Sequence, residues 1–114
     1  MELIELLEKL TAAFGPSGCE DGVRGVIADL IAPYVDEVRT DAMGSQIAHK
    51  KGEGKKLLFS AHMDSIGMIV THIEKEGFLR FGSLGWLPAL DIRRQGVVFR
   101  NGLRGTVSLP EDKE

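Results

Sequence analysis

The fold of this chain is most directly indicated by Lys56-Leu57-Leu58-Phe59-Ser60-Ala61-His62-Met63-Asp64. The first half of this stretch is a short apolar run, which is typical of a central β-strand covered on both faces. Open α/β sheets place their chemistry where such strands end. Residues i and i+2 of a strand point to the same side, so we expect His62 and Asp64 to face one cavity.

A histidine and a carboxylate at this spacing allow two interpretations. A neutral imidazole is a common zinc ligand, and a nearby carboxylate commonly fixes its tautomer. The pair is also typical of a buried histidine that is hydrogen-bonded to a neighbouring acid, and the short pattern alone slightly favours that structural role. Zinc sites use three or four protein ligands, and no His-Glu-x-x-His or Cys-x-x-Cys motif completes one here. His62 and Asp64 therefore indicate, at most, half of a metal site.

Composition narrows the class of protein. The chain has 114 residues, of which 43% are hydrophobic and 27% charged, and its net charge is -3. These values are typical of a soluble globular domain and give no reason to expect nucleic acid or a membrane as partner. The single cysteine, Cys19, fits a reducing compartment. No signal-peptide pattern and no run of about 20 apolar residues is present. We therefore expect a cytoplasmic protein.

The first half of the chain predicts helices followed by strands. Apolar residues recur at helical spacing from Leu3 to Phe14 and from Val23 to Ile31, which predicts two amphipathic helices. Between them, Gly15-Pro16-Ser17-Gly18 is a cluster of helix breakers, and Ser17, Glu20 or Asp21 can supply polar capping groups for the second helix. From Val35 to His49 the apolar period becomes alternating, which indicates strands joined by a turn.

The second half predicts short strands only. Its apolar runs are separated by Gly and Asn-Gly turns, a pattern typical of a small β-barrel or sandwich. We therefore expect an α/β fold with two N-terminal helices and a mixed sheet in residues 1–67. A small β-barrel or sandwich piece is expected in residues 68–114.

Several motifs, taken in order, resemble one enzyme family. The chain is similar over residues 3 to about 109 to the TET-type cocatalytic metalloaminopeptidases, the glutamyl and deblocking aminopeptidase group. The motifs that carry this resemblance are Phe14-Gly15-Pro16-Ser17-Gly18, Asp41-Ala42-Met43-Gly44-Ser45, Ala61-His62-Met63-Asp64 and Gly77-Phe78-Leu79-Arg80-Phe81. The resemblance implies that residues 1–67 are part of a zinc-peptidase α/β domain.

The resemblance also implies roles for the two site residues. His62 matches a ligand of one of two zinc or cobalt ions, and Asp64 matches an aspartate that orients this histidine from behind. In such enzymes the two metals activate a bridging water, polarise the scissile carbonyl and help anchor the free α-amine of a peptide substrate. The β-rich segment from about residue 68 matches the start of a β-barrel-like inserted domain. In the family this domain builds dimers, which assemble into large hollow particles. A homo-oligomer is therefore expected.

Two departures from the family pattern bear on activity. The family often has glutamate where this chain has Ser65, and no Asp or Glu after Asp64 matches the remaining metal ligands or the general base. We therefore expect a truncated N-terminal portion, roughly a third of a family enzyme, with weak metal binding and negligible peptidase activity by itself. Two alternatives are a non-catalytic self-association module and a relative that kept the scaffold but lost the site.

Overall fold

The chain divides into two compact units, which are described separately below. The computed structural model describes residues 2–108, and the division falls between Ser65 and Ile66. None of the helices in this described part has the length and apolar content that a membrane span requires.

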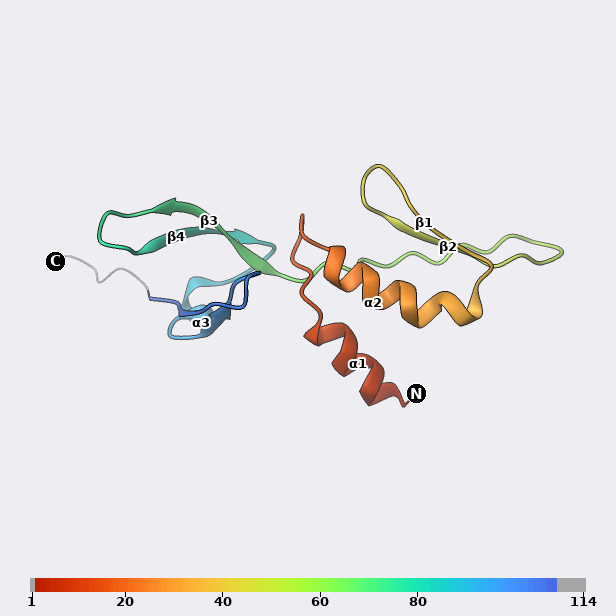
Figure 1. Cartoon of the computed structure of the whole chain (residues 1–114), viewed down its shortest axis with the longest axis horizontal. Helices are drawn as coiled ribbons and strands as arrows, with labels where there is room; N and C mark the ends of the chain where they lie inside the picture. The colour runs from red at the N-terminus through yellow and green to blue at the C-terminus, as the bar shows by residue number, and fades with distance from the viewer. Residues whose placement is uncertain (1, 109–114) are drawn as a thin grey trace. The chain divides into compact units, whose positions relative to one another are not determined.

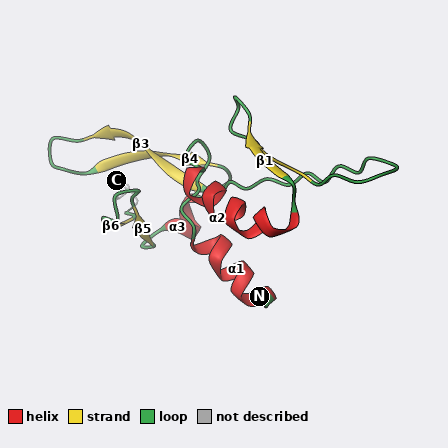
Figure 2. Cartoon of the chain, turned by 45° about the vertical axis from the view of Figure 1, so that its right-hand side comes forward, coloured by secondary structure: helices red, strands yellow, loops and turns green. Residues whose placement is uncertain are grey.

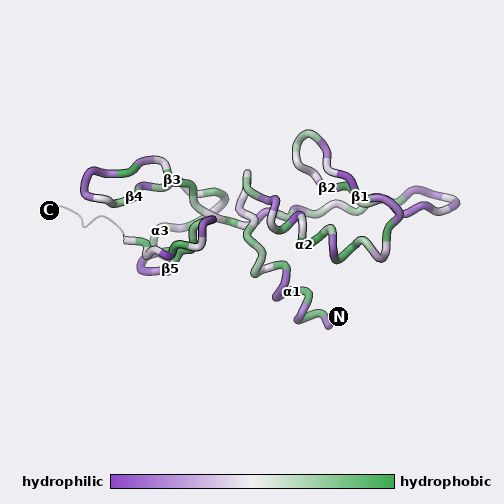
Figure 3. Tube along the Cα trace, in the orientation of Figure 1, coloured by the Kyte–Doolittle hydropathy of each residue, from purple (hydrophilic) through white to green (hydrophobic). Residues whose placement is uncertain are grey.

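Two helices open the first unit, in agreement with the helical periodicity. Helix α1 spans Leu3–Ala12 and helix α2 spans Asp21–Ile31 (Figures 1 and 2). Hydrophobic and hydrophilic residues follow one another along the turns of both helices (Figure 3). A short 3-10 turn, η1 (Ala32–Tyr34), extends α2. Within the described part of this unit, Val23 of α2 is the one buried apolar side chain, with 5% of its surface exposed.

A β-hairpin follows the helices, and it confirms the predicted alternation. Strand β1 (Glu37–Thr40) pairs antiparallel with β2 (Gln46–His49). The turn between them is closed by Asp41, whose carboxylate accepts hydrogen bonds from two backbone amides. Gly44 has φ +89°, a conformation that glycine adopts without strain. The hairpin is the only sheet that the described residues of this unit form.

The expected central strand is not formed, and this prediction is wrong. The segment after β2 runs without regular secondary structure through His62 (Figure 1). Its apolar side chains Leu57, Leu58 and Phe59 are 82%, 93% and 90% exposed. The segment lacks the hydrogen-bonded partner that a strand requires, since neither β1 nor β2 pairs with it through a free edge and no other described strand lies in this unit. The mixed sheet expected in residues 1–67 is likewise replaced by one two-stranded antiparallel sheet.

The second unit consists of two hairpins and a short helix. Strands β3 (Gly67–Ile73) and β4 (Leu79–Leu84) form one antiparallel pair, which has an irregularity between Val70 and His72. Helix α3 (Ala89–Ile92) precedes the second pair, β5 (Gly96–Val98) and β6 (Arg104–Thr106). Ile92 and Val107 are its buried apolar side chains within the described range. The strands there form two separate sheets, so a barrel is not confirmed.

Candidate functional site

His62 and Asp64 lie together near the end of the first unit. The His62 side chain is 85% exposed and the Asp64 side chain 38% exposed. The Nδ1 atom of His62 lies 3.1 Å from the Asp64 Oδ1 atom and 3.1 Å from the Asp64 backbone oxygen. The other two histidines, His49 and His72, are exposed strand residues outside this site.

The geometry around His62 defines its neutral tautomer. Both atoms near Nδ1 are oxygens of Asp64, one from an ionised carboxylate and one from a carbonyl, and neither can donate a proton. Nδ1 therefore carries the hydrogen when the ring is neutral. The lone pair is then on Nε2, which faces away from this hydrogen bond and is the atom available to a metal ion.

The second carboxylate oxygen of Asp64 is also engaged. Its Oδ2 atom accepts a hydrogen bond from the Ser17 hydroxyl, 47 residues earlier in the chain. This hydrogen bond is the main cause that holds the pKa of the Asp64 carboxyl below its usual range, and the hydrogen bond to His62 adds to it. With one oxygen on His62 and the other on Ser17, Asp64 is placed to orient the His62 ring.

Sequence reasoning missed the role of Ser17. Of the three candidates to cap the second helix, Glu20 is the residue that precedes the first turn of α2, and Ser17 lies outside that turn. The Gly-Pro-Ser-Gly motif pointed to an interhelical turn, and nothing local to it indicates a partner 47 residues away. The resemblance grouped this motif with Ala61-His62-Met63-Asp64, and that grouping was the one available clue.

Backbone contacts attach the Ser17 loop to the site. The Ser65 amide donates to the Gly15 carbonyl at 2.8 Å, and Pro16 and Ser65 form an isolated parallel bridge. Gly15 packs directly on Val23, so a Cβ added there would lie 2.5 Å from a Val23 methyl carbon. A glycine is therefore required at position 15 for the loop to reach both α2 and the site.

A cavity of about 380 Å³ borders the site within the first unit. Its walls come from α1, the interhelical loop and α2, and His62 and Asp64 form its polar end. The residues that line it are Leu10, Thr11, Ala13, Gly15, Val23, Ile27, His62, Met63, Asp64 and Ser65. A mostly apolar wall beside one exposed ring nitrogen is an arrangement that suits an organic ligand near a metal.

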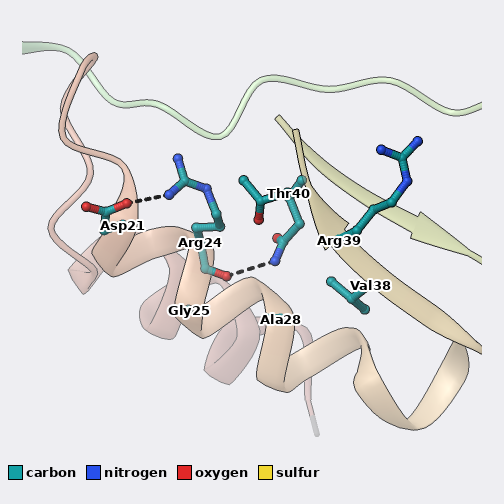
Figure 4. Close-up of a pocket in the computed structure, with 8 residues that line it drawn as sticks. Asp21, Arg24, Gly25, Ala28, Val38, Arg39 and Thr40 are labelled. Atoms are coloured by element: carbon teal, nitrogen blue, oxygen red, sulfur yellow. Dashed lines mark hydrogen bonds and ion pairs between the residues drawn. The ribbon is translucent and has the colours of Figure 1, made fainter. Parts of the chain in front are cut away.

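A second cavity, of about 450 Å³, lies between α2 and the β1–β2 hairpin (Figure 4). Arg24 pairs with Asp21, and its Nε atom donates to the Gly44 carbonyl at 3.0 Å. Gln46 donates through its Nε2 atom to the Arg24 backbone oxygen at 3.2 Å. These polar contacts join the hairpin to the helix. The cavity is therefore explained by the packing of these two elements, and its lining includes neither His62 nor Asp64.

The donor set allows one protein ligand for a metal. No group of three or more His, Cys, Asp or Glu side chains that could hold an ion occurs within residues 2–108. His62 fits as a single ligand because its side chain is 85% exposed and its Nδ1 atom is paired with Asp64, which leaves Nε2 for a metal. The described residues therefore supply one ligand of a metal site and not a complete set.

Comparison with known proteins decides the family. The family model described as M42 glutamyl aminopeptidase matches residues 44–110, more than half of the chain, and this range includes His62 and Asp64. The chain belongs to this family. The resemblance to TET-type metalloaminopeptidases that the motifs indicated is thereby confirmed.

Three M42-like relatives illustrate the match. A protein of Acetivibrio thermocellus, provisionally named an aminopeptidase, is 43% identical over 113 residues, which are 99% of this chain and 34% of that protein. The TET aminopeptidase from the marine sediment archaeon Thaumarchaeota archaeon SCGC AB-539-E09 is 35% identical with a TM-score of 0.83, covering 96% of this chain and 33% of that one. The TET1 peptidase of Pyrococcus horikoshii is 33% identical with a TM-score of 0.81, covering 99% and 37%.

This M42 chain spans about one third of the length of these relatives. The likeness confirms the coarse fold: the described residues, with three helices and small antiparallel sheets, match the fold of the TET aminopeptidase structures. The Pyrococcus horikoshii peptidase is described as able to assemble into a tetrahedron or a large octahedral shell.

Proposed function

We propose that this M42 family member forms part of a metal-dependent aminopeptidase, which removes residues one at a time from peptides with a free N-terminus. Family membership supports the reaction class. The observation that carries the proposal is the His62–Asp64 pair, in which Asp64 holds the Nδ1 hydrogen and leaves Nε2 exposed. A non-catalytic self-association module has no support from the relatives of Acetivibrio thermocellus and of the marine sediment archaeon, which bear aminopeptidase names.

Two divalent ions, zinc or cobalt, are the cofactor that we propose, with His62 Nε2 as a ligand of one of them. When bound, such a pair activates water and polarises the scissile carbonyl. Asp64 contributes by fixing the orientation of the imidazole and by raising its basicity. Because residues 2–108 supply no further cluster of ligands, we propose that the remaining ligands and the general base come from outside this range.

Partners follow from the same assignment. We propose a homo-oligomer built from dimers, with residues 68–114 as the start of the dimerisation domain and residues 1–67 as part of the catalytic domain. Exposed apolar side chains on β3 and β4 support a contact role for this region: Ile69, Val70, Ile73 and Leu79 are all at least 41% exposed. The absence of nucleic-acid and membrane partners stays a prediction from the net charge, and a cytoplasmic location stays a prediction as well.

Zinc titration of the metal-free chain tests the proposed ligand. The histidine ring nitrogens are followed by NMR while zinc chloride is added, and His49 and His72 serve as internal references because they are exposed histidines outside the site. His62 Nε2 is expected to respond first. The variant His62→Ala should lose this response and retain those of the two references. A uniform response of all three histidines would refute the ligand assignment.

Activity of the isolated chain is the second test. Hydrolysis of leucyl- and glutamyl-anilides in the presence of zinc or cobalt should be negligible. Catalytic sites typically hold their metal with three protein ligands, and residues 2–108 contain no group of three such side chains. Robust turnover by the purified 114-residue chain would contradict the proposal that the other ligands lie elsewhere.

A further inference from the structure

The Ser17 hydroxyl has no role in building the loop that contains it. The turn is made by backbone groups, since the Cys19 amide donates to the Pro16 carbonyl at 2.8 Å. Within the same loop, the carboxylate of Glu20, the residue that precedes the first turn of α2, accepts from the Gly18 amide at 2.6 Å. The half-buried Ser17 side chain instead donates out of the loop, to Asp64.

This hydrogen bond restricts the carboxylate of Asp64. The terminal torsion of an aspartate is broad, so a carboxylate that is bonded through only one oxygen can rotate about its last bond. Here Oδ1 pairs with His62 Nδ1 and Oδ2 accepts from Ser17. Two partners on opposite oxygens define the plane of the carboxylate, and thereby the direction in which His62 donates.

The main-chain attachment of the loop makes Ser17 a suitable anchor. The Gly15 carbonyl and the Ser65 amide are bonded at 2.8 Å, on the two segments that Ser17 and Asp64 belong to. Side chain and backbone therefore connect the same two segments at neighbouring positions. A donor on a fixed loop restrains its acceptor more than a donor on a mobile side chain would.

We propose that Ser17 is a positioning residue for the metal ligand: its hydroxyl fixes the Asp64 carboxylate, and Asp64 in turn keeps His62 in the Nδ1–H tautomer with Nε2 open to a divalent cation. The consequence for metal binding rests on the proposed function, whereas the effect on the tautomer does not. Ser17 acts through Asp64 and touches neither substrate nor metal.

Histidine NMR of the metal-free 114-residue chain tests the proposal. At about pH 8, above the ordinary histidine pKa of about 6.5, long-range proton–nitrogen correlations distinguish Nδ1–H from Nε2–H. The unsubstituted chain is expected to show His62 in the Nδ1–H form. Ser17→Ala should raise the Nε2–H population toward that of Asp64→Ala, which keeps only the backbone oxygen near Nδ1. Ser17→Thr retains a hydroxyl and should restore the Nδ1–H form.

Ser60→Ala is the matched control, because it removes a hydroxyl two residues from His62 on an exposed segment. It should leave the tautomer unchanged, and circular dichroism should show equal helix content in every variant. A Ser17→Ala chain that keeps its helices and remains fully in the Nδ1–H form would overturn the proposal.

Zinc chloride added to the same samples separates this proposal from the proposed function. Loss of an orienting partner typically lowers metal affinity about 10–100-fold, so Ser17→Ala should weaken the zinc response of His62 by about tenfold or more. If zinc leaves His62 Nε2 of the unsubstituted chain unaffected, the ligand assignment fails while the tautomer result still supports Ser17. If zinc binds but Ser17→Ala changes neither tautomer nor affinity, the positioning role alone fails.

Discussion

Two glycines in helix α2 provide a sharp test of the structure. Helix propensity alone predicts that replacing either Gly22 or Gly25 by alanine stabilises α2 by up to about 1 kcal/mol. The surroundings differ, however. A Cβ at position 25 meets no atom within 4 Å, whereas a Cβ at position 22 lies 2.5 Å from the Phe14 carbonyl oxygen.

The magnitude follows from this close approach. Ordinary van der Waals contact begins at 3.4 Å, so α2 and the chain at Phe14 must separate by roughly 1 Å in Gly22→Ala. The obstacle is backbone and cannot rotate away. Overpacking of this kind costs about 1–3 kcal/mol, which exceeds the propensity gain, particularly because Gly22 is in the first turn. We expect Gly22→Ala to destabilise the chain by about 1–2 kcal/mol and Gly25→Ala to stabilise it by about 0.5–1 kcal/mol.

Urea unfolding followed by far-UV circular dichroism measures both changes, and Gly25→Ala is the matched control for helix propensity. The displaced Phe14 adjoins Gly15, whose carbonyl bonds Ser65, so Gly22→Ala should also disturb the His62 tautomer. Equal shifts of the unfolding midpoint in the same direction for both variants would refute the argument from close approach.

Three further predictions concern the hairpin and the exposed segment. Backbone hydrogen bonding, chiefly from Ser45, lowers the pKa of Asp41 below 3.8. The stabilisation of the turn by the Asp41 carboxylate is therefore complete above pH 3.8 and is lost as the pH falls through the lowered pKa. Amide exchange at Ser45 should show this pH dependence, and Asp41→Asn should abolish it. Gly44→Ala should destabilise the hairpin by at least about 1 kcal/mol, because its φ is +89° and the new Cβ would lie 3.0 Å from Arg24; an unchanged urea midpoint would contradict this. Phe59→Lys should change the free energy of unfolding by less than about 0.5 kcal/mol, since Phe59 is 90% exposed. It should also reduce any self-association seen by light scattering. A large loss of stability would show that the ring is packed.

Local chemistry accounts for the elements that sequence reasoning predicted correctly. The helices α1 and α2 combine an apolar period with glycine and proline at their junction, and the β1–β2 turn is closed by Asp41 within a few residues of sequence. Each of these features depends on neighbours along the chain. The segment from Leu57 to Ala61 failed as a strand because strand formation depends on a hydrogen-bonding partner, and its own composition does not supply one.

The candidate site also combines features that depend on local sequence with features that depend on distant contacts. The sequence by itself determined that His62 and Asp64 share a neighbourhood, because two residues of separation keep them close in any extended backbone. Only the tertiary structure decided what holds them: Ser17, 47 residues away, reaches Asp64 because the Gly15 carbonyl bonds the Ser65 amide and because Gly15 and Gly22 permit close contacts with Val23 and Phe14. Contacts between distant segments depend on packing distances, and a pattern read along one stretch of chain contains no such distances.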